Sequence, residues 1–124
     1  CDAVNEHVCD LIRELKPRVW FIENPVGMLR KMPFIEQLMH DTGGHRHTIT
    51  YCQYGERRQK PTDIFTNHPD PKFKPPCRRG APCHDPAPRG SKTGTQGIKG
   101  RRDRAKLPSQ LCAHVVKVCE ELLE

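Results

Sequence analysis

The sequence predicts an α/β fold, in which part of a parallel sheet carries flanking helices and one long, irregular basic loop. Two stretches with apolar residues at helical spacing, 2–15 and 108–123, enclose short runs rich in β-branched and aromatic residues. Between residues 68 and 107 no periodicity is visible, and this stretch holds seven of the twelve prolines. At 124 residues the chain is one domain or part of one.

The first half predicts a helix followed closely by a buried strand. Residues 2–15 place valine, leucine and isoleucine three or four positions apart, and Lys16-Pro17 ends that pattern. Val19–Ile22 consists of large β-branched or aromatic residues, which is typical of a buried parallel strand. Glu23 would then lie at the carboxyl end of this strand, where open α/β sheets bind ligands.

The remaining elements follow in the same alternating manner. Residues 27–40 are expected to be partly helical, with Pro33 interrupting the helix or starting its second half. Residues 47–52 and 62–66 read as two strands of a hairpin-like pair, because a short loop containing glycine joins them. Residues 108–123 form the final helix, with proline in its first turn.

Positive charge is concentrated in the irregular stretch. Residues 68–107 contain eleven lysines and arginines against three acidic residues, a net charge of +8, whereas the whole chain carries +6. Such a distribution favours contact with the phosphates of a nucleic acid. The alternative is a solvated basic loop.

Composition also bears on the compartment. The chain has no apolar run long enough to span a membrane, and its first residues do not form a signal peptide. It starts inside a helical pattern, which suggests a fragment or a preceding segment. Seven cysteines without a sign of secretion favour an intracellular, reduced protein.

A metal site is expected within the irregular stretch. Cys77, Cys83 and His84 lie within eight residues that have almost no apolar content, and a zinc ion could supply the missing order. Cys52 or His68 could provide a fourth ligand. Two alternatives remain: ordinary free thiols, or a nucleophilic cysteine next to histidine.

A second candidate site is the glycine-, hydroxyl- and cation-rich stretch 89–102. It is not a P-loop, because the order of glycine, lysine and threonine is wrong and no strand leads into it. A flexible loop that grips a nucleic-acid backbone fits better. Disorder is the alternative.

The order of these pieces resembles the C-terminal half of the cytosine-5 DNA methyltransferases, especially the phage-type members. In that family a strand ends in Glu-Asn-Val, where this chain has Glu23-Asn24-Pro25. A strand, a Tyr-Gly turn and a Gln-x-Arg-x-Arg motif follow. Here Tyr54-Gly55 leads to the cationic residues 57–60 and then to a strand, although the motif itself does not match residue for residue.

The resemblance implies a division of the chain. Residues 1–67 and 105–124 would form a partial Rossmann-like methyltransferase core. Residues 68–104 would correspond to the target-recognition segment, stabilised by zinc if Cys77, Cys83 and His84 bind it.

The resemblance also implies a chemistry. Members of the family flip a cytosine out of the duplex, a cysteine thiolate attacks its C6 atom, and C5 takes a methyl group from S-adenosylmethionine. Glu23 matches the acid that hydrogen-bonds the base at N3. Basic side chains would contact DNA: Arg57, Arg58, Lys60, Arg78, Arg79, Arg89, Lys92, Lys99, Arg101 and Arg102.

Two parts of the family pattern have no match here. The chain lacks the Phe-x-Gly-x-Gly turn that binds the cofactor, and it lacks a Pro-Cys pair before Glu23. The prediction is therefore a later portion of the enzyme, inactive alone, whose partners are DNA and an upstream half or a second copy of the chain. The cytoplasm of a bacterium or phage-infected cell is the expected location. Two alternatives are a non-catalytic nucleic-acid-binding module that could bind zinc, and a small protein-interaction domain with an incidental basic loop.

Overall fold

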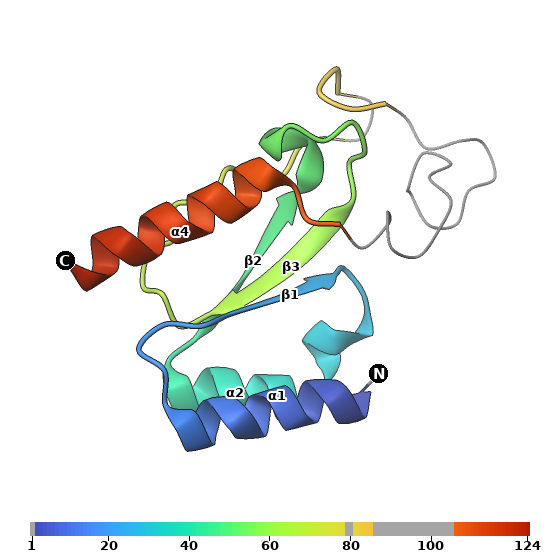
Figure 1. Cartoon of the computed structure of the whole chain (residues 1–124). Helices are drawn as coiled ribbons and strands as arrows, with labels where there is room; N and C mark the ends of the chain where they lie inside the picture. The colour runs from blue at the N-terminus through green and yellow to red at the C-terminus, as the bar shows by residue number, and fades with distance from the viewer. Residues whose placement is uncertain (1, 79–80, 86–105) are drawn as a thin grey trace.

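The computed structural model describes residues 2–78, 81–85 and 106–124, and in this part helices cover both faces of a three-stranded antiparallel sheet (Figure 1). This architecture confirms that helices and strands are mixed in one fold. The elements, in chain order, are α1 (Asp2–Leu15), β1 (Phe21–Pro25), the 3-10 helix η1 (Met28–Lys31), α2 (Pro33–Thr42), β2 (His45–Thr50), the 3-10 helix η2 (Tyr51–Tyr54), β3 (Pro61–Thr66) and α4 (Ser109–Leu123).

The strand order is β1-β3-β2, so the last strand lies in the middle. β3 pairs antiparallel with both neighbours, Phe21 lying opposite Thr66 on one side and His45 opposite Thr66 on the other. β1 and β2 therefore run in the same direction, and η1 and α2 form the crossover between them. The expected hairpin-like pairing of the second and third strands is confirmed.

The expectation of a parallel strand at residues 19–22 is wrong for the described residues, since the strand begins two residues later and its hydrogen-bonded neighbour is antiparallel. The shift has a local cause. The backbone N–H of Trp20 donates to Asn67 Oδ1 (2.9 Å), and the Trp20 carbonyl accepts from Thr66 Oγ1 (2.7 Å). The Trp20 backbone N–H and carbonyl are thus hydrogen-bonded to side chains, and the backbone pairing with β3 starts at Phe21.

Two apolar cores lie on opposite faces of the sheet, because side chains of a strand alternate between its faces. Phe65 packs with Trp20 and Leu38 against α1 and α2. The preceding residue, Ile64, packs with Leu111 against α4. Figure 1 shows the same arrangement, with α1 and α2 on one side of the sheet and α4 on the other.

The helix boundaries follow from their sequences. Pro33 starts α2, as one of the two sequence interpretations had it, since proline suits the first turn of a helix. Gly43 ends α2 with a left-handed backbone (φ 70°). In α1 the apolar stripe is only partly buried: Cys9 and Ile12 belong to the core, while Val4 and Leu15 are exposed.

Candidate metal centre and strand-end carboxylate

Four side chains from two segments converge just beyond the end of β2. Cys52 belongs to η2, and Cys77, Cys83 and His84 come from the irregular segment. The Sγ atoms of Cys52 and Cys77 are 3.0 Å apart, and those of Cys52 and Cys83 are 3.5 Å apart. His84 Nδ1 lies 3.5 Å from the Sγ atoms of both Cys77 and Cys83.

With metal–sulfur and metal–nitrogen bonds of about 2.3 and 2.0 Å, tetrahedral ligands lie about 3.8 Å (S to S) and about 3.5 Å (S to N) apart. The two distances from His84 equal the expected separation, the Cys52–Cys83 distance is close to it, and the Cys52–Cys77 distance is shorter and would have to lengthen around an ion. All four donor atoms lie within 4.8 Å of one another, and three thiols with one imidazole are a donor set typical of structural metal sites. The cluster could therefore hold a metal ion.

The fourth donor is Cys52 rather than His68, which settles an alternative that the sequence left open. Both ring nitrogens of His68 are engaged elsewhere. Its Nε2 donates to the Val118 carbonyl of α4 (2.9 Å), and its Nδ1 accepts from the Asp70 backbone N–H (3.0 Å). His68 thus fastens the end of β3 to α4.

Neighbouring polar groups hold the cluster in place. Thr50 Oγ1 accepts from the backbone N–H of Cys77 (2.9 Å), and Gln59 Nε2 lies 3.4 Å from Cys77 Sγ. Burial, and after it the hydrogen bond with Cys77, raise the pKa of Cys52 to about 12. Burial acts in the same direction on Cys77, but its hydrogen bonds, first the one with Cys52, outweigh burial and lower its pKa.

Glu23 is the third residue of β1, half-buried, and its carboxylate accepts a hydrogen bond from the Tyr51 hydroxyl (3.2 Å). Tyr51 is fully buried. Burial raises the pKa of the Tyr51 phenol, and the nearby Glu23 carboxylate raises it further. No local sequence pattern indicates this pair, because 28 residues separate its members.

The three basic residues that follow the Tyr54-Gly55 turn have different surroundings. Lys60 Nζ lies 5.0 Å from the centre of the Tyr51 ring, and the Arg58 guanidinium lies 5.2 Å from it. Arg58 is only 1% exposed and donates to the Lys106 carbonyl (2.8 Å), so it holds the chain before α4 in place. Arg57 is exposed and forms an ion pair with Asp85 (2.8 Å), directly after His84.

The predicted DNA-contacting residues are thus only partly described. Arg78 is exposed next to Cys77. Six others lie outside the described residues: Arg79, Arg89, Lys92, Lys99, Arg101 and Arg102.

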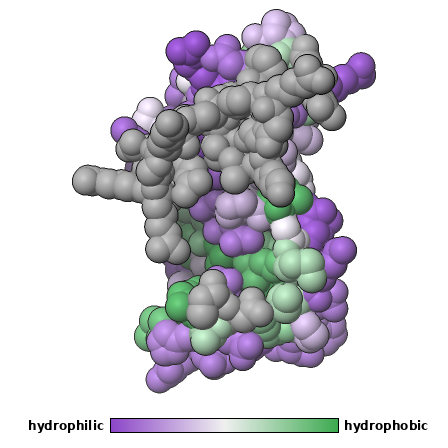
Figure 2. Space-filling model, turned by 90° about the vertical axis from the view of Figure 1, so that its right-hand side faces the viewer, coloured by the Kyte–Doolittle hydropathy of each residue, from purple (hydrophilic) through white to green (hydrophobic). Residues whose placement is uncertain are grey.

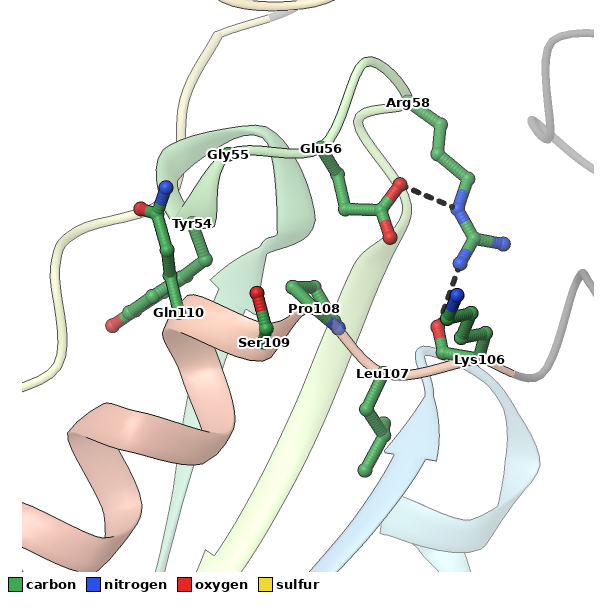
Figure 3. Close-up of a pocket in the computed structure, with 9 residues that line it drawn as sticks. All are labelled: Tyr54, Gly55, Glu56, Arg58, Lys106, Leu107, Pro108, Ser109 and Gln110. Atoms are coloured by element: carbon green, nitrogen blue, oxygen red, sulfur yellow. Dashed lines mark hydrogen bonds and ion pairs between the residues drawn. The ribbon is translucent and has the colours of Figure 1, made fainter.

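A cavity of about 480 Å³ lies between the Tyr54-Gly55 turn and the start of α4. Figure 3 shows Arg58 at one end of it, paired with Glu56 and with the Lys106 carbonyl.

On the side toward which β1 runs, Figure 2 shows apolar surface framed by polar residues. Val26 and Met28, which follow β1, are exposed.

No protein-family model, curated protein or solved structure matches this chain. Within the described residues, no helix has the length and apolar character needed to cross a membrane.

Proposed function

We propose that this chain is the later, DNA-contacting portion of a cytosine-5 DNA methyltransferase domain and that Glu23 is its base-activating acid. The observation that carries the proposal is the Glu23–Tyr51 pair, which joins the middle of β1 to the residue directly after β2; Glu23 thus lies within its strand and not at the carboxyl end that the sequence predicted. β1 and β2 run in the same direction, and ligands of open α/β sheets bind beyond the carboxyl ends of such strands.

The topology is compatible with the edge of a Rossmann-like sheet. Many doubly wound folds carry an antiparallel strand at the edge of an otherwise parallel sheet. β3 would be the antiparallel strand here, one position in from the edge strand β2, and the helix crossover from β1 to β2 is of the kind that connects parallel strands. Within the described part of the chain, β1 pairs along one edge only, so an upstream half or a second copy of the chain could add to its other edge.

In this proposal Glu23 hydrogen-bonds the flipped cytosine at N3 and thereby favours attack at C6. The Tyr51 hydroxyl keeps one carboxyl oxygen in place, and the other carries the proton that Glu23 donates to N3. S-adenosylmethionine would supply the methyl group, and no residue of this chain matches the family motif that binds it. The basic segment 68–104 would contact the DNA backbone, together with Arg57, which pairs with Asp85 of that segment.

A second candidate function is a non-catalytic nucleic-acid-binding module that zinc holds in shape. The specific observation in its favour is the cluster of Cys52, Cys77, Cys83 and His84. Zinc fits three thiols and one imidazole better than a hard cation does, since hard cations prefer oxygen ligands.

The decisive experiment compares Glu23→Gln with Glu120→Gln in the full-length protein that the complete reading frame encodes. Glu120 is exposed on α4 and serves as the matched control. We expect Glu23→Gln to reduce transfer of labelled methyl groups to DNA by about a hundredfold or more, because an acid acting in the transition state is lost. DNA affinity should remain within a few-fold of the unsubstituted protein, and Glu120→Gln should change neither quantity.

Equal loss of methyl transfer and DNA affinity in Glu23→Gln would show that Glu23 is structural. Stoichiometric zinc with salt-sensitive DNA binding, but without methyl transfer by the unsubstituted protein, would favour the second candidate. Absence of DNA binding at low salt would contradict both.

A further inference from the structure

The metal cluster and Glu23 are joined by one short stretch of backbone. Cys52 provides a thiol to the cluster, and the preceding residue, Tyr51, donates its hydroxyl to the Glu23 carboxylate. A single peptide unit therefore separates a metal ligand from the residue that holds the proposed base-activating acid.

A second connection runs through Gln59. Its carbonyl accepts the backbone N–H of Tyr51 (2.7 Å). Its side-chain amide lies 3.4 Å from the Sγ atom and 3.5 Å from the carbonyl of Cys77. Tyr51 is thus tied to two ligands of the cluster, to Cys52 through the chain and to Cys77 through Gln59.

The Tyr51 ring has little freedom to move independently of these connections. It is fully buried, it packs with Ile64 and Leu111, and two cationic side chains lie over it. Because dense packing couples neighbouring groups, a displacement of η2 displaces the Tyr51 hydroxyl. The position of that hydroxyl decides whether Glu23 receives its hydrogen bond.

We infer that a metal ion bound by Cys52, Cys77, Cys83 and His84 positions the Glu23 carboxylate through Tyr51, which is a positioning residue. The ion, of the zinc class, draws Cys52 and Cys77 into one ligand sphere and so fixes η2 against β1. The importance of Glu23 in a reaction rests on the proposed function, but its coupling to the metal does not. A metal that only attached residues 77–85 to the sheet would leave Tyr51 and Glu23 unaffected.

Coupling of this kind is reciprocal. If metal binding strengthens the Tyr51–Glu23 contact by some factor, loss of that contact must weaken metal binding by the same factor. The first test measures the zinc affinity of the purified chain by competition with a chromogenic chelator. We expect Tyr51→Phe, which removes the hydrogen bond, to lower this affinity about fivefold or more, within the usual range of coupling energies. Glu23→Gln should lower it in the same direction by a smaller factor, because the amide oxygen still accepts from Tyr51 but is a weaker acceptor than a carboxylate. Both substitutions preserve the shape of the side chain, and Glu120→Gln, the matched control, should leave the affinity unchanged.

The second test observes Tyr51 directly. The chain has two tyrosines, so incorporation of 3-fluorotyrosine gives two ¹⁹F signals, and Tyr54→Phe identifies that of Tyr51. We expect zinc to shift the Tyr51 signal in the otherwise unsubstituted chain, and we expect this shift to shrink in Glu23→Gln. A zinc-induced shift that Glu23→Gln leaves intact, together with unchanged zinc affinities in both variants, would overturn the inference.

The outcome separates this inference from the proposed function. If the zinc affinities change as expected but the encoded enzyme transfers no methyl group, the coupling stands and the methyltransferase proposal is wrong. If methyl transfer depends on Glu23 while zinc affinity does not, the proposed function stands and the coupling is wrong.

Discussion

Asp63 is a buried carboxylate in the central strand, and Arg30 of η1 neutralises it. The Arg30 Nη2 and Nε atoms donate to the two Asp63 oxygens at 2.6 and 2.8 Å, and Thr48 Oγ1 donates at 2.9 Å. Asp63 is only 1% exposed, so its charge depends on these donors. The pair fastens the β1–α2 crossover to the middle of the sheet.

Arg30→Met should therefore destabilise the fold by about 3 kcal/mol, because removing one partner of a buried ion pair leaves the other charge unpaired. Urea unfolding would measure the change. Arg13→Met is the matched control: Arg13 pairs with Asp41 near the surface, and its loss should cost at most about 1 kcal/mol. If the double variant Arg30→Met/Asp63→Leu were no more stable than Arg30→Met, an unpaired Asp63 charge would not be the cause.

At the scale of elements, the junction between η2 and α4 brings the second half of the fold together. Gly55 ends η2 with a left-handed backbone (φ 89°) and lies against the Gln110 side chain of α4. His114 Nε2 on α4 donates a hydrogen bond to the Pro71 carbonyl (2.6 Å), and Arg58 donates to the Lys106 carbonyl just before the helix. These contacts position α4 over the face of the sheet that carries Ile64.

Gly55→Ala should lower stability by about 1–2 kcal/mol, since an L-residue is strained in the left-handed region. An added Cβ would also lie 2.5 Å from Gln110 Nε2, although this flexible side-chain end can move. Thermal unfolding of Gly55→Ala beside Gly27→Ala gives the comparison. Gly27 has an extended backbone (φ 178°), and its Cβ would lie 3.7 Å from the nearest atom, so its substitution should have little effect. An equal loss in both variants would contradict the role assigned to the left-handed turn.

At the scale of the whole molecule, the metal cluster connects the irregular segment to the sheet. The cluster brings Cys52 of η2 together with Cys77, Cys83 and His84, and the Arg57–Asp85 ion pair extends the same attachment by one residue. If a metal ion binds there, its ligation energy would be a large part of the folding energy of a segment with so few apolar residues.

Removal of zinc by a chelator should therefore leave the helices and strands largely intact but expose residues 77–85 to proteolysis. Circular dichroism and limited digestion measure the two effects. The same measurements on Cys83→Ser, which removes one thiol of the cluster, have Cys112→Ser as their control, because Cys112 is an exposed cysteine of α4 outside the cluster. Zinc affinity should fall as pH falls, since the ligands must lose protons to bind the ion and burial raises the pKa of Cys52 to about 12. Digestion that is indifferent to zinc would contradict a metal-ordered segment.

Elements with local evidence could be predicted from the sequence. The spacing of apolar residues predicted the two terminal helices, and the β-rich runs with their intervening glycine predicted the pair β2 and β3, although Tyr51 and Cys52 of the expected strand belong to η2. Three of the four metal-site residues are also close together in the chain, so Cys77, Cys83 and His84 could be named in advance. The methyltransferase resemblance stays a prediction.

Strand direction, the fourth member of the cluster and the partner of Glu23 depend on contacts between distant residues, which the sequence does not show. β3 lies between β1 and β2 through contacts between residues some 40 positions apart, and no local pattern records which strand will be the neighbour. Cys52 and His68 were equivalent as donors until the fold directed His68 to α4 and Cys52 to Cys77. Tyr51 was part of the predicted strand 47–52, and the pairing of β1 with β3 is what brings Glu23 within hydrogen-bonding distance of its hydroxyl.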